Sequence, residues 1–386
     1  YFPVLDDAGR LLPYFVVVRN GGREHLDLVR AGNEGVIRAR YADADYFFKQ
    51  DTRRALEDFL PRLGTLTFQE ALGSMRDKSE RLEQLAPWLG LRLGLSALEL
   101  AALTRAARLA KADLATQMVV EMTSLQGVMG REYALASGEP PAVAQAIFEH
   151  YLPRTAGDAP PTSAAGVALA LADRLDSLAG LFAVGLAPTG SADPYGLRRA
   201  ALGLVQILLE RKLDFSVREG LLEAARALPV PLSDAALDEA VAFVAGRLQG
   251  VLRDAGLAHD VVEAALAARG DNPFLAQQVA QQLRGWIARE DWPLLLDNYA
   301  RCVRITRDHP RYALDASQLT EPAERALYAA LVETEARVTP QGGVDGFLAA
   351  FVPLVPLIQA FFDNVLVMAE EDAVREARLA LLQRVA

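Results

Sequence analysis

The chain has 386 residues, of which 52% are hydrophobic and 23% charged. These values are typical of a globular protein with a sizeable core, and they exclude a disordered, collagen-like or disulfide-stapled chain. Fifty acidic and 40 basic residues give a net charge of −10, which does not favour general binding of nucleic acid. Any RNA contact must therefore come from a local basic patch.

Neither a cysteine-based metal site nor a membrane span is expected. Cys302 is the single cysteine, so no intrachain disulfide or cysteine-based zinc site can form, and we expect Cys302 to be a core residue. The four histidines lie far apart, without the spacing of a zinc motif. The longest apolar stretch, 347–362, contains two prolines and Gln359, and we expect it to be too short and broken to span a bilayer. A reduced, cytoplasmic setting is expected.

A β-hairpin is predicted at the start, where apolar segments at 1–5 and 15–18 flank a turn signal at 6–9. Because the first residue is Tyr1 rather than Met, we expect the chain to be part of a longer protein. After residue 22, apolar residues recur at intervals of three and four, which predicts helices. We expect helices within 29–58 and at 68–85, 95–120, 142–151 and 167–180, with loops at 157–166 and 187–193.

The second half is predicted to be entirely helical. Asp193 is a candidate N-cap for a helix over 195–210, with Pro194 in its first turn. From about 216 a helical array is expected, with breaks at 229–231, 256, 270–273 and 292–293, and it closes at Pro310. Residues 320–386 predict a bundle of about three helices. The chain is thus expected to be mainly all-α and multi-domain.

Charged residues on three predicted helices follow an order that resembles HD-type metal phosphohydrolases. In that family a first His, a His-Asp pair and a later Asp bind metal. Here Lys78 stands in the first His position, Ala112 precedes Asp113, and Asp173 is the later aspartate. An ammonium repels a divalent cation and alanine offers no lone pair, so we predict a degenerate site without metal. We expect Lys78 to pair with Asp113 or Asp173, and His150 to be a packed histidine rather than a residual ligand.

The best basic feature is a run of arginines near the end of the helical array. Arg301, Arg304 and Arg307 are spaced by three residues, so on a helix they share one face, with Tyr299 nearby. This face is a candidate rail for phosphates. A solvated helix face without a ligand is the alternative.

Several stretches resemble the C-terminal part of the bacterial glycyl-tRNA synthetase beta subunit. They are GNEGVIRARYADADYFF (32–48), FQEALGSMRDKSERL (68–82), KADLATQMVVEMTSLQGVMGREYA (111–134), EHYLPR (149–154), ALADRLDSL (170–178) and PTGSADPYGLRRAALG (188–203). The final stretch FFDNVLVMAEEDAVREARLALL resembles the helical, DALR-like anticodon-binding domain also found in arginyl-tRNA synthetases. The resemblance runs from about residue 14 to the C-terminus.

The resemblance implies a domain organisation and a function. Residues 1–40 would be the tail of a β-rich domain and a connector, 41–215 an HD-like domain, 216–315 a helical linker or body, and 316–386 the anticodon-binding bundle. The chain would bind tRNA(Gly) and read its anticodon, as part of glycine–tRNA ligase. A separate alpha subunit, or the alpha region of a fused chain, would hold the class II catalytic site and use ATP and Mg²⁺. The segment itself would hold no catalytic residue and no cofactor.

The partners follow from the same resemblance: tRNA(Gly) and the alpha subunit, in an α2β2 or fused dimeric assembly, with no DNA and no membrane. Arg375 and Arg378 lie three apart on the last predicted helix and are candidate contacts to the anticodon arm. Asn364 is a candidate base reader. Arg198 and Arg199 follow a glycine-containing loop near a helix N-terminus, where backbone N–H groups hold phosphate.

Two other functions stay open. The first is an HD-type phosphohydrolase acting on nucleotides or RNA ends, which the missing His-Asp pair argues against. The second is a non-catalytic scaffold for the alpha subunit, which the net charge of −10 keeps open. If the chain binds tRNA, Lys78 in the degenerate metal site is a further candidate RNA-binding residue, which would contact the acceptor arm.

Overall fold

The computed structural model describes residues 1–155, 157–190, 192–339 and 342–385. This part of the chain is mainly helical with two small antiparallel strand pairs, which confirms the predicted fold class. In chain order the elements are β1 Phe2–Leu5, β2 Leu11–Val16, α1 Leu26–Asp51, η1 Leu56–Thr65, β3 Thr67–Gln69, β4 Gly73–Ser74, α2 Met75–Arg92, α3 Ala97–Leu109, η2 Ala112–Ala115, α4 Gln117–Glu121, η3 Thr123–Leu125, α5 Val128–Ala136, α6 Pro141–Glu149, α7 Ala164–Ala183, α8 Leu197–Glu210, α9 Val217–Ala225, α10 Asp234–Asp254, α11 His259–Arg269, α12 Pro273–Ile287, α13 Trp292–Thr306, η4 Ala316–Gln318, α14 Pro322–Glu335, α15 Gly343–Phe351, η6 Val352–Leu354, α16 Val355–Asn364 and α17 Asp372–Val385.

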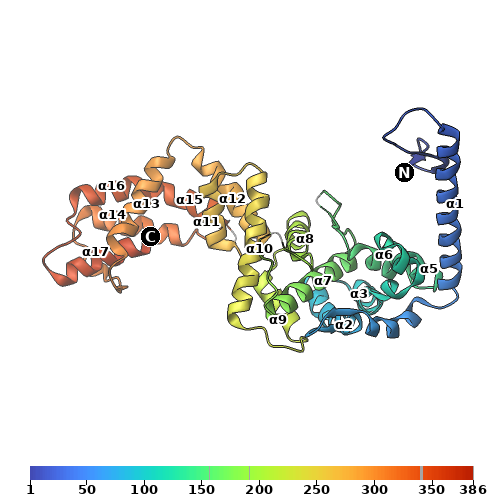
Figure 1. The fold of residues 1–386 in the computed structure, drawn as a ribbon. Coiled ribbons are helices and arrows are strands. Elements are labelled where there is room, and N and C mark those ends of the chain that lie inside the picture. Colours follow the sequence, from blue (N-terminus) through green and yellow to red (C-terminus); the bar gives the residue numbers. More distant parts are fainter. Residues whose placement is uncertain (156, 191, 340–341, 386) are drawn as a thin grey trace.

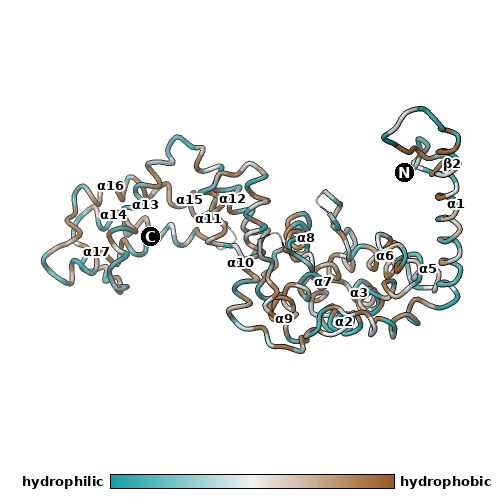
Figure 2. Tube along the Cα trace, viewed as in Figure 1, coloured by the Kyte–Doolittle hydropathy of each residue, from teal (hydrophilic) through white to brown (hydrophobic). Residues whose placement is uncertain are grey.

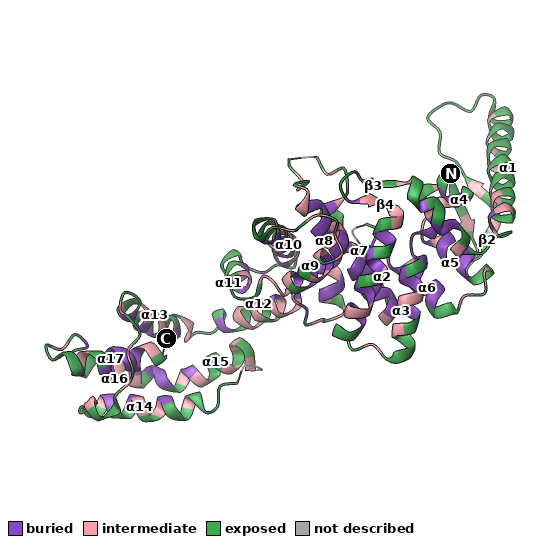
Figure 3. Cartoon of the chain, turned by 90° about the horizontal axis from the view of Figure 1, so that it is seen from below, coloured by how far each residue is buried: buried purple, intermediate pink, exposed green. Residues whose placement is uncertain are grey.

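The molecule is elongated (Figure 1). The hairpin β1–β2, which confirms the predicted one, lies at one end beside α1. Polar and apolar residues alternate along α1 (Figure 2), and most of this helix is exposed (Figure 3). Its last residue, Asp51, is buried and accepts hydrogen bonds from the backbone N–H groups of Gln117 and Met118 and from the hydroxyl of Tyr133. These bonds fasten the end of α1 to the helical body.

The predicted helix at 68–85 is wrong at its start, where β3 and β4 pair before α2 begins. Gly73 has φ +85°, a conformation that glycine adopts at little cost and that a side chain opposes. Ser74 then caps α2: its hydroxyl accepts from the backbone N–H of Asp77, whose carboxylate accepts from the N–H of Ser74. This reciprocal cap sets where α2 starts and therefore which face Lys78 occupies.

The predicted stretch 95–120 is likewise not one helix. It divides into α3, the short η2 and α4, and Thr116 caps α4 by accepting from the N–H of Val119. Asp51 supplies acceptors for the first N–H groups of α4 from more than sixty residues away. A periodic sequence pattern carries no sign of such a long-range cap.

The first hydrophobic core surrounds α7, which is buried on nearly all sides (Figure 3). The element spans 164–183, close to the predicted 167–180, and Ser163 caps it. Helices α2, α3, α6, α8, α9 and α10 pack against it. The first core extends along the chain from Leu56 to Ala280 and includes residues of α10, α11 and α12.

The second core begins at Trp286, near the end of α12, and runs to Val385. It includes Leu295 and Cys302 of α13, so this helix packs with α16 and α17 although the predicted division at 315/316 separates them. Cys302 is a buried core residue, as predicted. The C-terminal bundle in the described residues contains α14, the continuous helical run of α15, η6 and α16, and α17, in agreement with the prediction of about three helices.

The apolar stretch near the C-terminus is longer than predicted. Gly343–Asn364 forms a helical run that is, by length and composition alone, apolar enough to cross a membrane. Its two prolines stand in the first turns of η6 and α16, where no N–H donor is needed, so they do not break the run. In this structure Phe351, Ile358 and Phe361 bury one face of it in the second core.

Candidate functional site

A buried ionic cluster joins α2 to α7 at the predicted degenerate site. The ammonium of Lys78 lies 3.0 Å from Oδ1 of Asp173 and 2.8 Å from Oδ2 of Asp176. It also donates hydrogen bonds to the hydroxyl of Ser177 and the carbonyl of Asp173. Lys78 is 3% exposed. The predicted ion pair of Lys78 is therefore confirmed with Asp173 and not with Asp113.

Two further cations complete the cluster. Lys111 donates to Oδ2 of Asp173 over 3.1 Å, and its ammonium lies 4.3 Å from the centre of the Tyr151 ring. Arg81 donates from Nε to Oδ1 of Asp176 over 2.5 Å. Three cations thus hold two carboxylates, so neither carboxylate is left uncompensated away from water.

The electrostatics of the cluster favour the ionised carboxylates. Burial opposes the charge of Asp173, but Lys111 and Lys78 outweigh it and hold the pKa of Asp173 well below its usual value. Burial also opposes the charge of Lys78, and Asp173 and Asp176 reverse this effect and raise the pKa of Lys78. For Lys111 burial prevails and its pKa is lowered.

Asp113 lies apart from the Lys78 ammonium. Its Oδ2 accepts the backbone N–H of Gly127 over 2.6 Å, and burial raises its pKa to about 6. His150 is fully buried, and its Nδ1 is 2.5 Å from the carbonyl oxygen of Ile147. Burial, reinforced by Lys111, lowers the pKa of His150 well below its usual value, so the ring is neutral. His150 is a packed histidine, as predicted.

The donor set of this cluster does not fit a divalent cation. Both oxygens of Asp173 are taken by ammonium groups, Ala112 has no ligand atom, and the described residues include no group of three or more His, Cys, Asp or Glu side chains arranged to hold a metal. Metal-assisted hydrolysis therefore has no support from these residues. The burial of Lys78 also corrects the prediction of an acceptor-arm contact, because its ammonium does not reach the surface.

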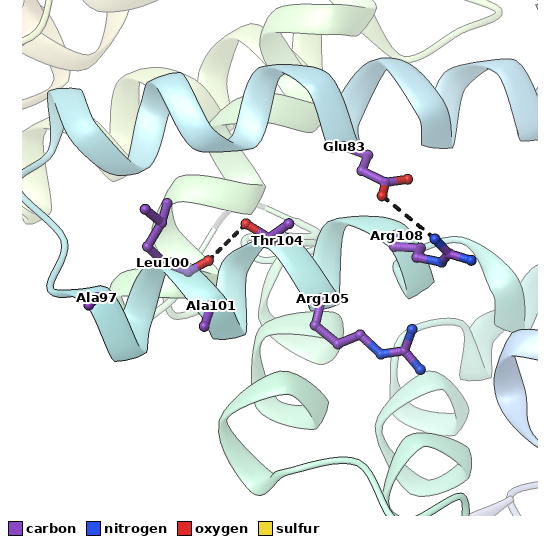
Figure 4. Close-up of a pocket in the computed structure, with 7 residues that line it drawn as sticks. All are labelled: Glu83, Ala97, Leu100, Ala101, Thr104, Arg105 and Arg108. Carbon is purple, nitrogen blue, oxygen red and sulfur yellow. Dashed lines mark hydrogen bonds and ion pairs between the residues drawn. The ribbon is translucent and has the colours of Figure 1, made fainter.

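An open groove of about 500 Å³ lies between α2 and α3, lined by Leu100, Thr104, Arg105 and other residues (Figure 4). Its polar groups are already bonded: Arg105 to Glu57 and Glu139, and the Thr104 hydroxyl to the Leu100 carbonyl. Arg108, which faces Glu83 in Figure 4, also pairs with Glu57. The groove presents no uncommitted charge for a ligand.

The two arginines predicted to contact the anticodon arm, Arg375 and Arg378, both bond to other groups of the chain itself. Arg378 is buried, and it donates from Nε to Oε1 of Glu324 over 2.5 Å and from Nη1 to the carbonyl of Leu366. Arg375 donates to the carbonyl of Ala369 and pairs with Asp372. Arg378 is thus an interior residue that joins α14 to α17. This corrects its prediction as a surface contact, because the shared face points partly into the bundle.

The polar groups of the loop before α8 likewise bond to one another and to the start of that helix. The N-cap of α8 is Gly196 and not Asp193, so that prediction is wrong, and α8 begins two residues later than expected. The carboxylate of Asp193 nevertheless accepts the backbone N–H groups of Leu197 and Arg198 over 2.8 and 3.0 Å. These N–H groups are therefore occupied and do not offer a phosphate site. The guanidinium of Arg198 donates to the carbonyls of Gly190 and Ala192, whereas Arg199 is exposed.

The arginine run on α13 stays at the surface. Arg301, Arg304 and Arg307 are all exposed; Arg304 and Arg307 each have a carboxylate, of Asp297 and Asp308 respectively, at 3.5 Å. The guanidinium carbon of Arg301 lies 4.0 Å from the centre of the Phe362 ring on α16. Tyr299 instead packs against Phe347 and Phe351, on the core side of α13.

Asn364 ends α16 and is exposed. Its side-chain amide donates to the carbonyl of Ala360 over 2.7 Å, so one of its hydrogen-bonding groups is used within its own helix. It lies two positions beyond Phe362, on a different face of α16. The structure does not bring Asn364 and Arg301 to one face.

Several residues of these sites were missed by the sequence analysis. Arg81 and Asp176 lie three residues beyond Lys78 and Asp173, which on two facing helices is the spacing of a second ion pair. Lys111 directly precedes the predicted Ala112-Asp113 position. No local sequence pattern pairs Phe362 with Arg301.

Comparisons with known proteins cover the whole chain. Residues 1–267 match the family model of the glycyl-tRNA synthetase beta subunit, and residues 295–386 match that of the DALR anticodon binding domain. The glycine–tRNA ligase beta subunits of Desulforudis audaxviator and Clostridioides difficile are 44% and 40% identical, with all of this chain and 57% and 56% of the relative aligned. Glycine–tRNA ligase, chloroplastic/mitochondrial 2, of Arabidopsis thaliana is 40% identical, with all of this chain and 36% of the relative aligned. The chain thus spans little more than half the length of these bacterial relatives.

Proposed function

Because the chain belongs to the glycyl-tRNA synthetase beta subunit family, as its motifs predict, we propose that it is the tRNA-binding part of a glycine–tRNA ligase. It positions tRNA(Gly) and reads the anticodon. An alpha subunit, or the alpha region of a fused chain, carries out glycylation with ATP and Mg²⁺. The observation that carries this proposal is the DALR anticodon binding domain match over 295–386, which includes all the buried residues of the second core except Trp286.

The surface of the bundle supports a contact with a single-stranded loop. Sequence-specific recognition of RNA uses unpaired bases, which proteins bind by stacking and by a few hydrogen bonds. Arg301, Arg304 and Arg307 give α13 a cationic face for the phosphates of such a loop. This local patch supplies what the net charge of −10 does not.

The part of the chain around the first core supports a structural role rather than hydrolysis. Its ionic cluster around Lys78 and Asp173 lies at the positions that correspond to the metal ligands of HD-type phosphohydrolases. Cations of the chain itself take the place of a metal there. The HD-type hydrolase alternative is therefore not favoured. The body instead fixes the helices to which α12 and the bundle are attached.

The proposed partners are tRNA(Gly) and an alpha subunit, in an α2β2 or fused dimeric assembly, without DNA or membrane. We place the protein in the cytoplasm, by analogy with the bacterial relatives, while the name of the plant relative indicates an organelle.

The test is a titration of this chain with glycine tRNA at about 50 and 150 mM salt, and with the same tRNA carrying an altered anticodon. Tighter binding of the natural anticodon supports the proposal. Equal and strongly salt-dependent binding of both tRNAs indicates phosphate contacts alone and overturns anticodon reading. No binding at either salt favours a scaffold for the alpha subunit.

A further inference from the structure

We propose that Arg301, held against the ring of Phe362, forms a platform on which one unpaired base of the anticodon loop stacks. This inference rests on the proposed function and adds the residues that make the contact. The sequence analysis identified neither residue as a base-stacking group and assigned Arg301 to the phosphate rail.

The geometry of the pair distinguishes it from the other surface arginines. At 4.0 Å, the contact between Arg301 and Phe362 is the shortest of the cation–ring contacts among the described residues. Such a short distance places the guanidinium over the ring rather than beside it. One face of Arg301 is therefore covered by the chain itself, which orders the side chain before any ligand arrives.

The ring beneath Arg301 is itself fixed. Phe362 is partly buried, and it meets the fully buried Phe361 edge to face, with ring centres 5.6 Å apart. Helices α13 and α16, which carry the two halves of the platform, pack against each other. A base that stacks on Arg301 therefore meets a preformed surface, which lowers the entropic cost of binding.

The hydrogen-bonding groups of Arg301 are free for a ligand. Within the described part of the chain Arg301 makes no hydrogen bond or ion pair, and its side chain is exposed. Arg304 and Arg307 differ, since each faces a carboxylate at 3.5 Å. Arg301 thus combines an available planar face with five uncommitted N–H donors.

These properties favour an unpaired nucleobase over a duplex. Guanidinium planes and aromatic rings bind splayed bases in single-stranded RNA, and this contact depends less on net charge than binding along a phosphate backbone does. Acidic Asp297 on α13, Asp308 just beyond this helix and Asp363 on α16 weaken a purely electrostatic contact. Stacking is consequently the contribution that Arg301 supplies, while Arg304 and Arg307 act on phosphates.

The experiment measures binding of the complete 386-residue chain to an anticodon stem-loop RNA with 2-aminopurine in the loop, by its fluorescence. The variants are Arg301→Ala, Arg301→Lys and Phe362→Leu. The matched control is Arg304→Ala, one turn further along α13. Circular dichroism melts confirm that each variant is folded.

The expected loss is about tenfold in affinity for Arg301→Ala, together with loss of the 2-aminopurine stacking signal. Arg301→Lys keeps the charge, so its salt dependence stays that of the wild type while it loses most of the affinity. Arg304→Ala weakens binding of every loop sequence similarly and lowers the salt slope by about one. We expect Phe362→Leu to resemble Arg301→Lys.

Wild-type binding by Arg301→Lys would overturn the platform, as would Arg301→Ala matching Arg304→Ala in both affinity and salt slope. These failures are separable from that of the proposed function. If the wild-type chain binds natural and altered loops equally, anticodon reading is overturned before any variant is measured. If it discriminates and the Arg301 variants bind as tightly as the wild type with the stacking signal intact, only the stacking platform is wrong.

Discussion

Lys78 and Asp173 form a buried ion pair between α2 and α7, with 3.0 Å between Nζ and Oδ1. Lys111 holds the second oxygen of the same carboxylate. A buried ion pair is a weak source of net stability, but removal of one partner leaves an uncompensated charge away from water. The cluster therefore makes the packing of α2 on α7 depend on all of its members.

Lys78→Met is expected to lower the free energy of unfolding by about 3 to 5 kcal/mol, because the carboxylates of Asp173 and Asp176 lose a shared cation. Urea unfolding followed by circular dichroism measures this change. Arg76→Met is the control, since Arg76 pairs with Glu80 at the surface and its loss should cost less than about 1 kcal/mol. Equal stability of the two variants would contradict a structural role of the cluster.

Arg378→Met is expected to destabilise the C-terminal bundle by about 3 kcal/mol, because it leaves the buried carboxylate of Glu324 unpaired. The double variant Arg378→Met with Glu324→Leu should recover most of this loss, since it removes both charges. Arg375→Met, whose partner Asp372 is exposed, serves as the control and should cost less than about 1 kcal/mol. If the double variant is less stable than Arg378→Met alone, the assignment is wrong.

Asp113 predicts a pH dependence of stability. Its pKa is about 6 in the folded chain and 3.8 in the unfolded one, so between these values the folded state binds more protons. The contribution of Asp113 to the free energy of unfolding therefore falls as pH rises through this window, by about 3 kcal/mol for two pH units. Asp113→Asn keeps an acceptor for the Gly127 N–H and cannot ionise, so its stability relative to the wild type should rise from pH 4 to pH 7. The prediction fails if that difference is constant with pH.

Metal analysis of the purified chain should find no stoichiometric divalent cation. The ammonium groups of Lys78 and Lys111 repel such an ion and occupy the oxygens of Asp173. Treatment with EDTA should leave the Tm unchanged. One equivalent of manganese, iron or zinc, with a lower Tm after its removal, would instead revive the hydrolase interpretation.

Much of the fold follows from local sequence patterns, and the exceptions have identifiable causes. The hairpin, α7 and the helical array from α10 to α13 follow from periodicity and turn residues. The strand pair β3–β4 and the division of 95–120 do not. Gly73 and the distant carboxylate of Asp51 decide those two places, and tertiary contacts of this kind override local propensity.

The sites show the same division. The pairing of Lys78 was predictable because a buried charge needs a partner, and the facing helices offered few. The position of Arg378 was not, because residues three apart on a helix share a face whether that face meets solvent or protein. Glu324, fifty-four residues earlier in the chain, determines that Arg378 points inward.

Helix α12 contributes Ala276 and Ala280 to the first core and Trp286 to the second. Trp286 donates from its indole N–H to Asp345, and Gln282 accepts the backbone N–H of Val344, so α15 is attached to the same helix. The orientation of the C-terminal bundle relative to the first core therefore depends on the number of residues in α12 between the two sets of contacts. One residue inserted between Ala280 and Gln282 would rotate the bundle by about 100° around the axis of α12. Insertion of a whole helical turn would restore its orientation and shift the bundle by about 5 Å along that axis.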